Sequence, residues 1–156
     1  MILGACGGEG GDDTIDITHD ACAPLTLLTA SAPTAAQTTA IHGAIALWRE
    51  HGAPLLRPPG TDPSALAPTI EIRFEDAAPP FFGLYDDEHG VIYINQQITD
   101  PQALTIVLAH ELGHAFGLEH VTGRTSLMNP GNYAQPPTAD DEAALVALWG
   151  TCATGE

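Results

Sequence analysis

The sequence predicts an α+β domain, because well-delimited helical segments enclose stretches that alternate as strands do. Helices are expected at about residues 34–51, 101–116 and 138–150. Between the first two, residues 69–74 and 91–95 alternate their side chains with the period of two that is typical of strands. A chain of 156 residues is long enough to form one domain around its own hydrophobic core.

The first third of the chain predicts two short strands and a long helix. Residues 14–18 and 25–28 are short apolar stretches that we interpret as strands or pairing segments. The helix that follows is marked by a capping box of Thr34 and Gln37. Its apolar side chains, which end with Trp48, fall on one stripe, so this helix is expected to pack against a core.

The middle of the chain alternates proline-rich connections with strands. Residues 52–68 contain five prolines and are expected to form a loop, and residues 77–83 are a second such connection. An acidic, turn-forming stretch at residues 86–90 then leads into the strand at 91–95. We expect this turn to be solvated, so the sequence does not support a structural calcium site there.

The two later helices have clear boundaries in the sequence. Asp100 and Pro101 suit the N-cap and the first helical position of the second helix, and Gly117 suits its end. The third helix has Thr138 as its expected cap, acidic residues in its first turn and Gly150 as its stop.

The charge balance excludes one class of partner. The chain has 20 acidic residues, four arginines and no lysine, which gives a formal net charge of −16. Phosphate backbones are bound by clustered basic side chains, so nucleic acid is not an expected partner. No apolar stretch reaches the roughly 18 residues of a transmembrane helix.

The three cysteines predict one disulfide and one cysteine with a different role. A bond between Cys22 and Cys152 would close a long loop around the domain and would require an oxidising compartment. The alternative is that these two residues are separate buried thiols.

The third cysteine, Cys6, follows Leu3-Gly4-Ala5, which resembles the end of a bacterial lipoprotein signal. We therefore expect residues 1–13 to contain a lipid-attachment site and a glycine-rich tether, followed by a single domain at 14–156. An irrelevant disordered leader is the alternative.

The second helix contains the residues that predict a metal site. His110 and His114 are four apart and so share one helical face. Zinc prefers four ligands in a tetrahedron, and Gly117 lets the chain turn so that His120 can supply a third nitrogen and leave one position for water. Glu111, beside the first histidine, is then placed as the general base.

The stretch from His110 to His120, HELGHAFGLEH, matches HExxHxxGxxH at every fixed position, and the chain resembles the metzincin zinc peptidases. Downstream, Ser126-Leu127-Met128-Asn129-Pro130 resembles their methionine turn, which implies that Met128 forms an apolar floor under the metal. The resemblance implies a twisted, mostly parallel sheet with an antiparallel edge strand, a long first helix, an active-site helix and a C-terminal helix. A small bacterial relative of the matrixins is the closest resemblance, although Val121 stands where matrixins usually carry serine.

The same resemblance implies a substrate cleft. Residues 91–95 resemble the edge strand to which a substrate adds as an antiparallel strand, and residues 130–133 resemble a wall of the pocket after the scissile bond. Tyr133 could alternatively bind near the zinc or simply pack. The implied cleft residues are Val91, Ile92, Tyr93, Ile94, Asn95, Pro130 and Tyr133.

The function that the sequence predicts is a monomeric zinc-dependent endopeptidase, acting outside the cell or at a bacterial cell envelope on peptide or protein substrates. One alternative is an aminopeptidase or other narrowly specific peptidase. The other is a non-proteolytic zinc-binding interaction module, against which the intact Glu111 argues.

Overall fold

The computed structural model describes residues 14–62, 67–78 and 81–153, so Cys6 and the expected tether lie outside the described residues. The elements in chain order are β1 (Leu25–Thr29), α1 (Ala35–Glu50), β2 (Leu56–Arg57), β3 (Thr69–Glu75), β4 (Gly83–Asp86), β5 (Val91–Asn95), α2 (Pro101–Ala115) and α3 (Ala139–Trp149). The predicted α+β class is confirmed, and all three expected helices are present.

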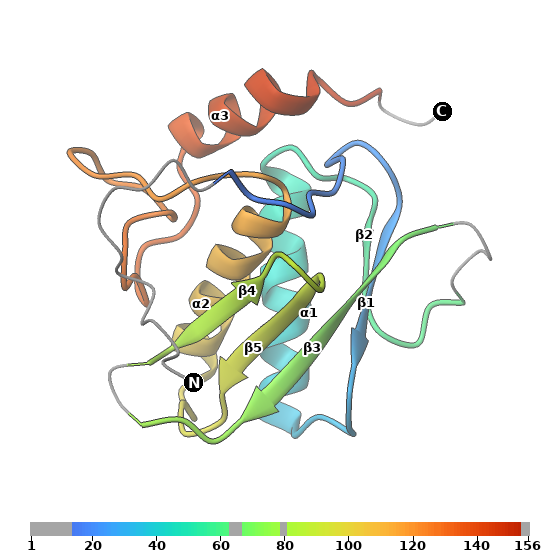
Figure 1. Ribbon diagram of the computed structural model, residues 1–156, viewed down its shortest axis with the longest axis vertical. Coiled ribbons are helices and arrows are strands. Elements are labelled where there is room, and N and C mark those ends of the chain that lie inside the picture. The colour runs from blue at the N-terminus through green and yellow to red at the C-terminus, as the bar shows by residue number, and fades with distance from the viewer. Residues whose placement is uncertain (1–13, 63–66, 79–80, 154–156) are drawn as a thin grey trace.

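The strands form one mixed sheet in the order β2-β1-β3-β5-β4. The pairs β2–β1, β1–β3 and β3–β5 are parallel, and β4 pairs antiparallel with β5. Figure 1 shows the arrow of β4 running against those of β1, β3 and β5. A mostly parallel sheet with an antiparallel edge strand is therefore confirmed.

The edge strand, however, is β4, and the expectation that Val91–Asn95 forms the edge is wrong. β5 lies between two neighbours, since Ile92 pairs with Ile72 on one side and with Tyr85 on the other. Residues 77–83 have the composition of a proline-rich connection, which conceals the four-residue strand that begins at its end. A strand that is paired on both sides has no free backbone edge for another chain.

Of the two alternatives expected for residues 14–18, the structure shows a pairing segment and not a strand. It is fastened to the turn between β4 and β5, because the Ile17 N–H donates to the Asp87 carbonyl at 3.0 Å. The Tyr85 hydroxyl also donates to the Ile17 carbonyl at 2.8 Å. One backbone hydrogen bond does not form a β-ladder, so the segment is an N-terminal arm that is bonded to the β4–β5 hairpin.

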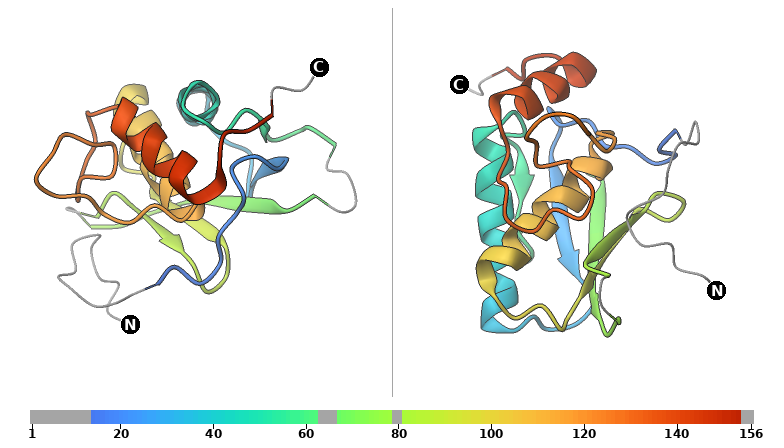
Figure 2. Two further views of the ribbon diagram at one scale, coloured as in Figure 1. Left: turned by 90° about the horizontal axis from the view of Figure 1, so that it is seen from above. Right: turned by 90° about the vertical axis from the view of Figure 1, so that its left-hand side faces the viewer.

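Helices α1 and α2 lie side by side on one face of the sheet, as the right-hand view of Figure 2 shows. The capping box of Thr34 is present, and the apolar stripe of α1 is buried. Its Trp48 is fully buried and donates from Nε1 to the Ala109 carbonyl of α2 at 2.8 Å. The Trp48 ring also meets Phe116 edge-on, with centroids 5.6 Å apart, so the core fixes α2 against α1.

Helix α3 lies across one end of the molecule, beyond the ends of α1 and α2 (Figure 1). Trp149 near its C-terminus donates from Nε1 to the Phe116 carbonyl at 2.7 Å. Just beyond the helix, Cys152 forms the expected disulfide with Cys22. Within the described part of the chain, no helix is long and apolar enough to cross a membrane.

Candidate metal centre

Helix α2 places the first two histidines. The Asp100 side chain accepts a hydrogen bond from the Ala103 N–H at 3.0 Å, and Pro101 occupies the first turn, as the sequence predicts. The helix runs without interruption to Ala115. His110 and His114 therefore project from successive turns on one face.

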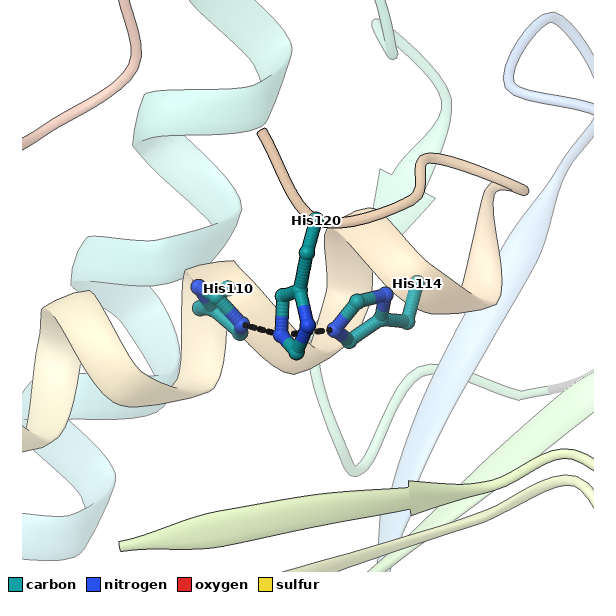
Figure 3. A group of neighbouring side chains, drawn as sticks. All are labelled: His110, His114 and His120. Atoms are coloured by element: carbon teal, nitrogen blue, oxygen red, sulfur yellow. Dashed lines mark hydrogen bonds between the residues drawn. The ribbon is translucent and has the colours of Figure 1, made fainter. Parts of the chain in front are cut away.

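The third histidine returns to this face because the chain turns sharply after α2. Gly117 has a φ of +97°, a conformation that residues with a Cβ rarely adopt. The Leu118 N–H then donates to the Gly113 carbonyl at 2.9 Å, which closes the helix end. Figure 3 shows His120 descending from the following segment between His110 and His114.

The three imidazoles have the separation that zinc requires. His120 Nε2 lies 3.2 Å from His110 Nε2 and 3.2 Å from His114 Nε2. Two zinc–nitrogen bonds of about 2.0–2.1 Å at a tetrahedral angle separate their nitrogens by roughly 3.3–3.4 Å. Among the described residues, these histidines are the one group of three or more His, Cys, Asp or Glu side chains close enough to hold a metal ion.

Backbone carbonyls set the tautomers of two of the three histidines. His110 Nδ1 lies 2.8 Å from the Leu127 carbonyl, and His114 Nδ1 lies 2.7 Å from the Leu118 carbonyl. A carbonyl can only accept, so both Nδ1 atoms carry the proton and both Nε2 atoms carry the lone pair that binds a metal. This arrangement is typical of ligating histidines, whose outer nitrogen is bonded to a neighbour.

Burial keeps the imidazoles in the neutral form that binds metal. Burial lowers the pKa of His110 to about 4, against a smaller opposing effect of its bond to Leu127. Burial, and then the neighbouring histidines, lower the pKa of His114 to about 3. Burial also lowers the pKa of His120. At neutral pH all three are therefore uncharged.

Glu111 is almost completely buried beside the triad, with 2% of its surface exposed. Burial raises its pKa to about 8, and a hydrogen bond from the Tyr85 backbone opposes that rise. Its Oε2 atom is buried without a hydrogen-bond partner, which is unusual for a carboxylate oxygen. The protein itself therefore leaves this acceptor oxygen unpaired, which a group that takes up a proton beside a metal requires.

Two glycines near Glu111 and the histidines are needed for close packing, although sequence reasoning did not single them out. A Cβ on Gly83 of β4 would lie 3.2 Å from Glu111 Cγ and 3.0 Å from Val107 Cγ1. A Cβ on Gly113 would collide with Met128 Sδ. Glycine inside a helix is disfavoured by about 1 kcal/mol relative to alanine, so Gly113 was itself a signal of close packing.

Met128 is 1% exposed and lies against α2 at Gly113, between the two histidines of the helix. This position agrees with the expected apolar floor. Downstream, Tyr133 is 56% exposed, and its ring lies 5.5 Å from that of Phe82, which directly precedes β4. The implied wall segment thus contacts the start of the true edge strand, and its role in binding substrate stays a prediction.

The remaining implied cleft residues belong to the interior of the sheet. Ile92 and Ile94 are fully buried in the core, and Asn95 donates from Nδ2 to the carbonyls of Ala77 and Phe81. Tyr93 is covered on its ring by the Arg73 guanidinium, 5.9 Å from the centroid. The backbone edge expected of these residues is supplied by β4.

Comparison with known proteins agrees with this geometry. The matrixin family model matches residues 81–150, which include β4, β5, all three histidines and Met128. The chain is a metzincin-like zinc metallopeptidase. No curated protein matches it in sequence. The metzincin-like fold is also evident from solved structures of low sequence identity.

Two such structures cover most of the chain. The archaemetzincin from Methanopyrus kandleri is 14% identical, covers 82% of this chain and 96% of its own, and has a TM-score of 0.58. Myroilysin is 10% identical, covers 86% of each chain, and also has a TM-score of 0.58. These similarities confirm the metzincin architecture, whereas the zinc chemistry rests on the site itself and on the matrixin match.

Proposed function

We propose that this chain is a zinc-dependent endopeptidase that hydrolyses peptide bonds in extended protein or peptide substrates. His110, His114 and His120 are the zinc ligands, and Glu111 is the general base. The observation that carries the proposal is the triad of neutral imidazoles, in which His120 Nε2 lies 3.2 Å from the Nε2 atoms of both His110 and His114, beside a buried carboxylate. Three protein ligands leave one coordination position open, which is the pattern of a catalytic zinc rather than a structural one.

Glu111 moves the proton in the proposed reaction. When bound, zinc supplies a Lewis acid that lowers the pKa of a water molecule and polarises the substrate carbonyl. Glu111 Oε2 accepts the proton of the attacking water and returns it to the nitrogen of the leaving amine. Burial raises the pKa of Glu111 to about 8 in the metal-free chain, and the charge of a bound zinc ion would lower it, so that the carboxylate can accept the proton near neutral pH.

The free edge of β4 is the proposed binding edge for the substrate. In the part of the chain that the structure describes, β4 ends the sheet with β5 as its one neighbour, so its outer side can receive an added strand. An antiparallel substrate would run from Asp86 towards Gly83, and the missing side chain of Gly83 lets β4 itself pack close to Glu111. Residues after the scissile bond would then reach Phe82 and Tyr133, which supports Tyr133 and the neighbouring Pro130 as a wall of that pocket.

The proposed location is outside the cytosol, at a bacterial cell envelope or beyond it. The Cys22–Cys152 bond supports this location, because disulfides persist in oxidising compartments. The proposal includes lipid attachment at Cys6 in the precursor and a monomeric catalytic domain. Intact-mass measurement of the protein purified from membranes tests the lipid directly, since an acylated Cys6 adds the mass of its fatty chains.

The function is tested by incubating the zinc-loaded protein with an unstructured protein and with peptides blocked at both ends, with and without a chelator. Glu111→Gln removes the proposed base and is expected to lower the cleavage rate by roughly 10²–10⁴-fold, the range of general acid–base catalysis, without loss of zinc. Glu119→Gln is the matched control. It removes the same charge from an exposed residue next to His120 and should leave cleavage unchanged.

The outcomes separate the alternatives. Cleavage of blocked peptides that a chelator abolishes supports the endopeptidase. Cleavage only of peptides with a free amino terminus would replace it by an aminopeptidase. Zinc binding without cleavage by either the wild type or Glu111→Gln would replace it by a zinc-binding interaction module.

A further inference from the structure

We propose that Asp141 is a positioning residue for the zinc site, acting on His110 through the backbone on both sides of Leu127. The inference rests on the proposed function in so far as it takes His110 to be a zinc ligand. Asp141 itself lies in the first turn of α3 and touches none of the three histidines. Its charge was expected only to favour the N-terminus of that helix.

The Asp141 carboxylate is buried, at 1% exposure, and is surrounded by hydrogen-bond donors. Oδ2 accepts from the Leu127 N–H at 2.8 Å and from the Thr138 N–H at 2.9 Å. Oδ1 accepts from the Ser126 hydroxyl, and Arg124 Nη1 lies 3.4 Å from it. A buried carboxylate with this many donors stays ionised and fixes the groups around it.

Two of these bonds control two successive peptide planes. The Leu127 N–H belongs to the plane that joins Ser126 to Leu127, and Asp141 binds it directly. The next plane, from Leu127 to Met128, is bound indirectly, because the Met128 N–H donates to Ser126 Oγ at 2.9 Å. The Ser126 hydroxyl in turn donates to Asp141. Asp141 therefore fixes Leu127 from both sides.

The second peptide plane, from Leu127 to Met128, contains the carbonyl that binds His110. In a trans peptide the N–H and the C=O point in opposite directions, so holding the Met128 N–H aims the Leu127 carbonyl the other way. That carbonyl accepts from His110 Nδ1 at 2.8 Å. Asn132 Nδ2 donates to the same oxygen at 3.0 Å and holds it from another direction.

In this chain of hydrogen bonds, every donor points towards the Asp141 carboxylate. It leads from the Asp141 carboxylate through the Ser126 hydroxyl and the Met128–Leu127 peptide to the imidazole of His110. Each bond in such a chain polarises the next, so the negative charge makes the Leu127 carbonyl a stronger acceptor. A stronger acceptor at Nδ1 makes the other ring nitrogen, Nε2, a better metal ligand, as a directly bonded carboxylate does in other zinc sites.

Zinc affinity measured by competition with a chelator tests this role. Asp141→Ala removes both the charge and the grip on Leu127, and the zinc Kd is expected to rise about 10–100-fold, the usual effect of losing an outer partner of a ligating histidine. Asp141→Asn can keep its oxygen towards Leu127 and Thr138, but its amide nitrogen replaces Oδ1, so it loses the charge and the acceptor for the Ser126 hydroxyl. The zinc Kd of Asp141→Asn is therefore expected to rise by a smaller factor than that of Asp141→Ala.

Thr138→Ala is the control for a merely structural role. Thr138 caps α3 through Oγ1, which accepts from the Asp141 N–H at 3.2 Å, but its side chain makes no bond to Leu127. Losing the cap destabilises the helix, so the thermal midpoint should fall in both Thr138→Ala and Asp141→Ala. Only Asp141→Ala should weaken zinc binding. A zinc Kd within twofold of that of Thr138→Ala would overturn the proposal.

Two further measurements keep the test independent of folding losses and of the proposed function. If Asp141→Ala does not fold, Ser126→Ala breaks the Met128 branch alone and should also raise the zinc Kd. In the metal-free protein, the ¹⁵N shifts of the His110 ring report its tautomer. They should show a proton on Nδ1 in the wild type and a mixed population in Asp141→Ala. An unchanged tautomer would contradict the inference even if the wild type bound no zinc, whereas a failure of the wild type to bind zinc would count against the proposed function.

Discussion

Helix α2 carries two histidines of the proposed zinc site and α3 carries Asp141, which supports it, and the two helices are held in place by different forces. α2 buries ten of its fifteen residues against α1 and the sheet. α3 buries only two of its eleven, Asp141 and Leu145. It is attached by directional bonds instead, from Asp141 to the methionine turn, from Trp149 to Phe116, and through the disulfide just beyond its end.

The difference shows that the two halves of the site respond to different changes. Burial of apolar surface has no direction and is spread over many side chains, so no single contact fixes the helix backbone that carries His110 and His114. The methionine turn depends on a few hydrogen bonds, each of which leaves a buried polar group without a partner if it is lost. We therefore expect α2 to tolerate small losses and the α3 side of the site to be sensitive to single polar substitutions.

The largest expected effect on stability is that of the disulfide, which closes a loop across 130 residues of sequence separation. The double variant Cys22→Ser with Cys152→Ser should lose about 4–5 kcal/mol of unfolding free energy in the chain-entropy model, measured by urea denaturation. Amide hydrogen exchange should also rise more in α3 than in α2, because the bond pins the end of α3.

Adding a reductant separates this bond from any effect of the substituted side chains. It should destabilise the wild type to the level of the double variant and leave the variant unchanged. If the variant loses less than about 1 kcal/mol, the hydrogen bonds of Asp141 and Trp149 suffice to hold α3, and the contrast between the two helices is weaker than proposed.

The α2 half of the site could be predicted from the sequence because its determinants are local. The cap at Asp100, the histidines four apart and the glycine at position 117 each act within a few residues. The capped boundaries of α1 and α3 were predictable for the same reason. These features depend on helix geometry, which sequence spacing expresses directly.

What the sequence could not supply depends on contacts between distant segments. The place of β5 inside the sheet depends on the short strand β4, whose four residues lack a clear alternating pattern. The burial of Asp141 depends on the methionine turn, which lies 14 residues away at Leu127. Its N3 position in the capping box with Thr138 separates Asp141 from Asp140 locally, but that spacing does not predict that the same carboxylate binds the Leu127 N–H and the Ser126 hydroxyl.

The pH dependence of the metal-free protein sharpens the comparison, because α2 carries three groups with shifted pKa values. His110 and His114 have a folded pKa of about 4 and about 3, below the 6.5 of the unfolded chain. The unfolded state then binds more protons below pH 6.5, so stability should fall as the pH drops from 6.5 towards 4. Glu111 has the opposite sign: its folded pKa of about 8 exceeds the unfolded 4.5, so it costs stability as the pH rises from 4.5 to 8.

Thermal or urea unfolding in a chelator, from pH 4 to 9, measures these two contributions. Each group changes the free energy by at most about 1.4 kcal/mol per pH unit within its own window. The metal-free wild type should be most stable near pH 6.5. Glu111→Gln removes the second contribution, so its advantage over the wild type should grow between pH 4.5 and 8 and stay constant above pH 8. A constant difference across the whole range would show that Glu111 is not held in a buried, uncharged form.

The smallest expected effect tests the contact between α2 and the methionine turn. Gly113→Ala gains about 1 kcal/mol of helix propensity but places a Cβ against Met128 Sδ and, at 3.3 Å, against the rigid ring of Trp48 at Cζ2. Overpacking usually costs about 1–3 kcal/mol, so the net result should be a loss of up to about 2 kcal/mol.

Repeating Gly113→Ala in a Met128→Ala background makes this a double-mutant cycle. With the sulfur gone, the new methyl group has room, so the propensity gain should prevail and the sign should reverse. Gly43→Ala in α1 is the control, because its Cβ would meet the side chain of Thr105 and not Met128, so its effect should be the same with and without Met128. A loss that persists without Met128 would locate the constraint at Trp48, and the core between α1 and α2 rather than the methionine turn would then explain the glycine.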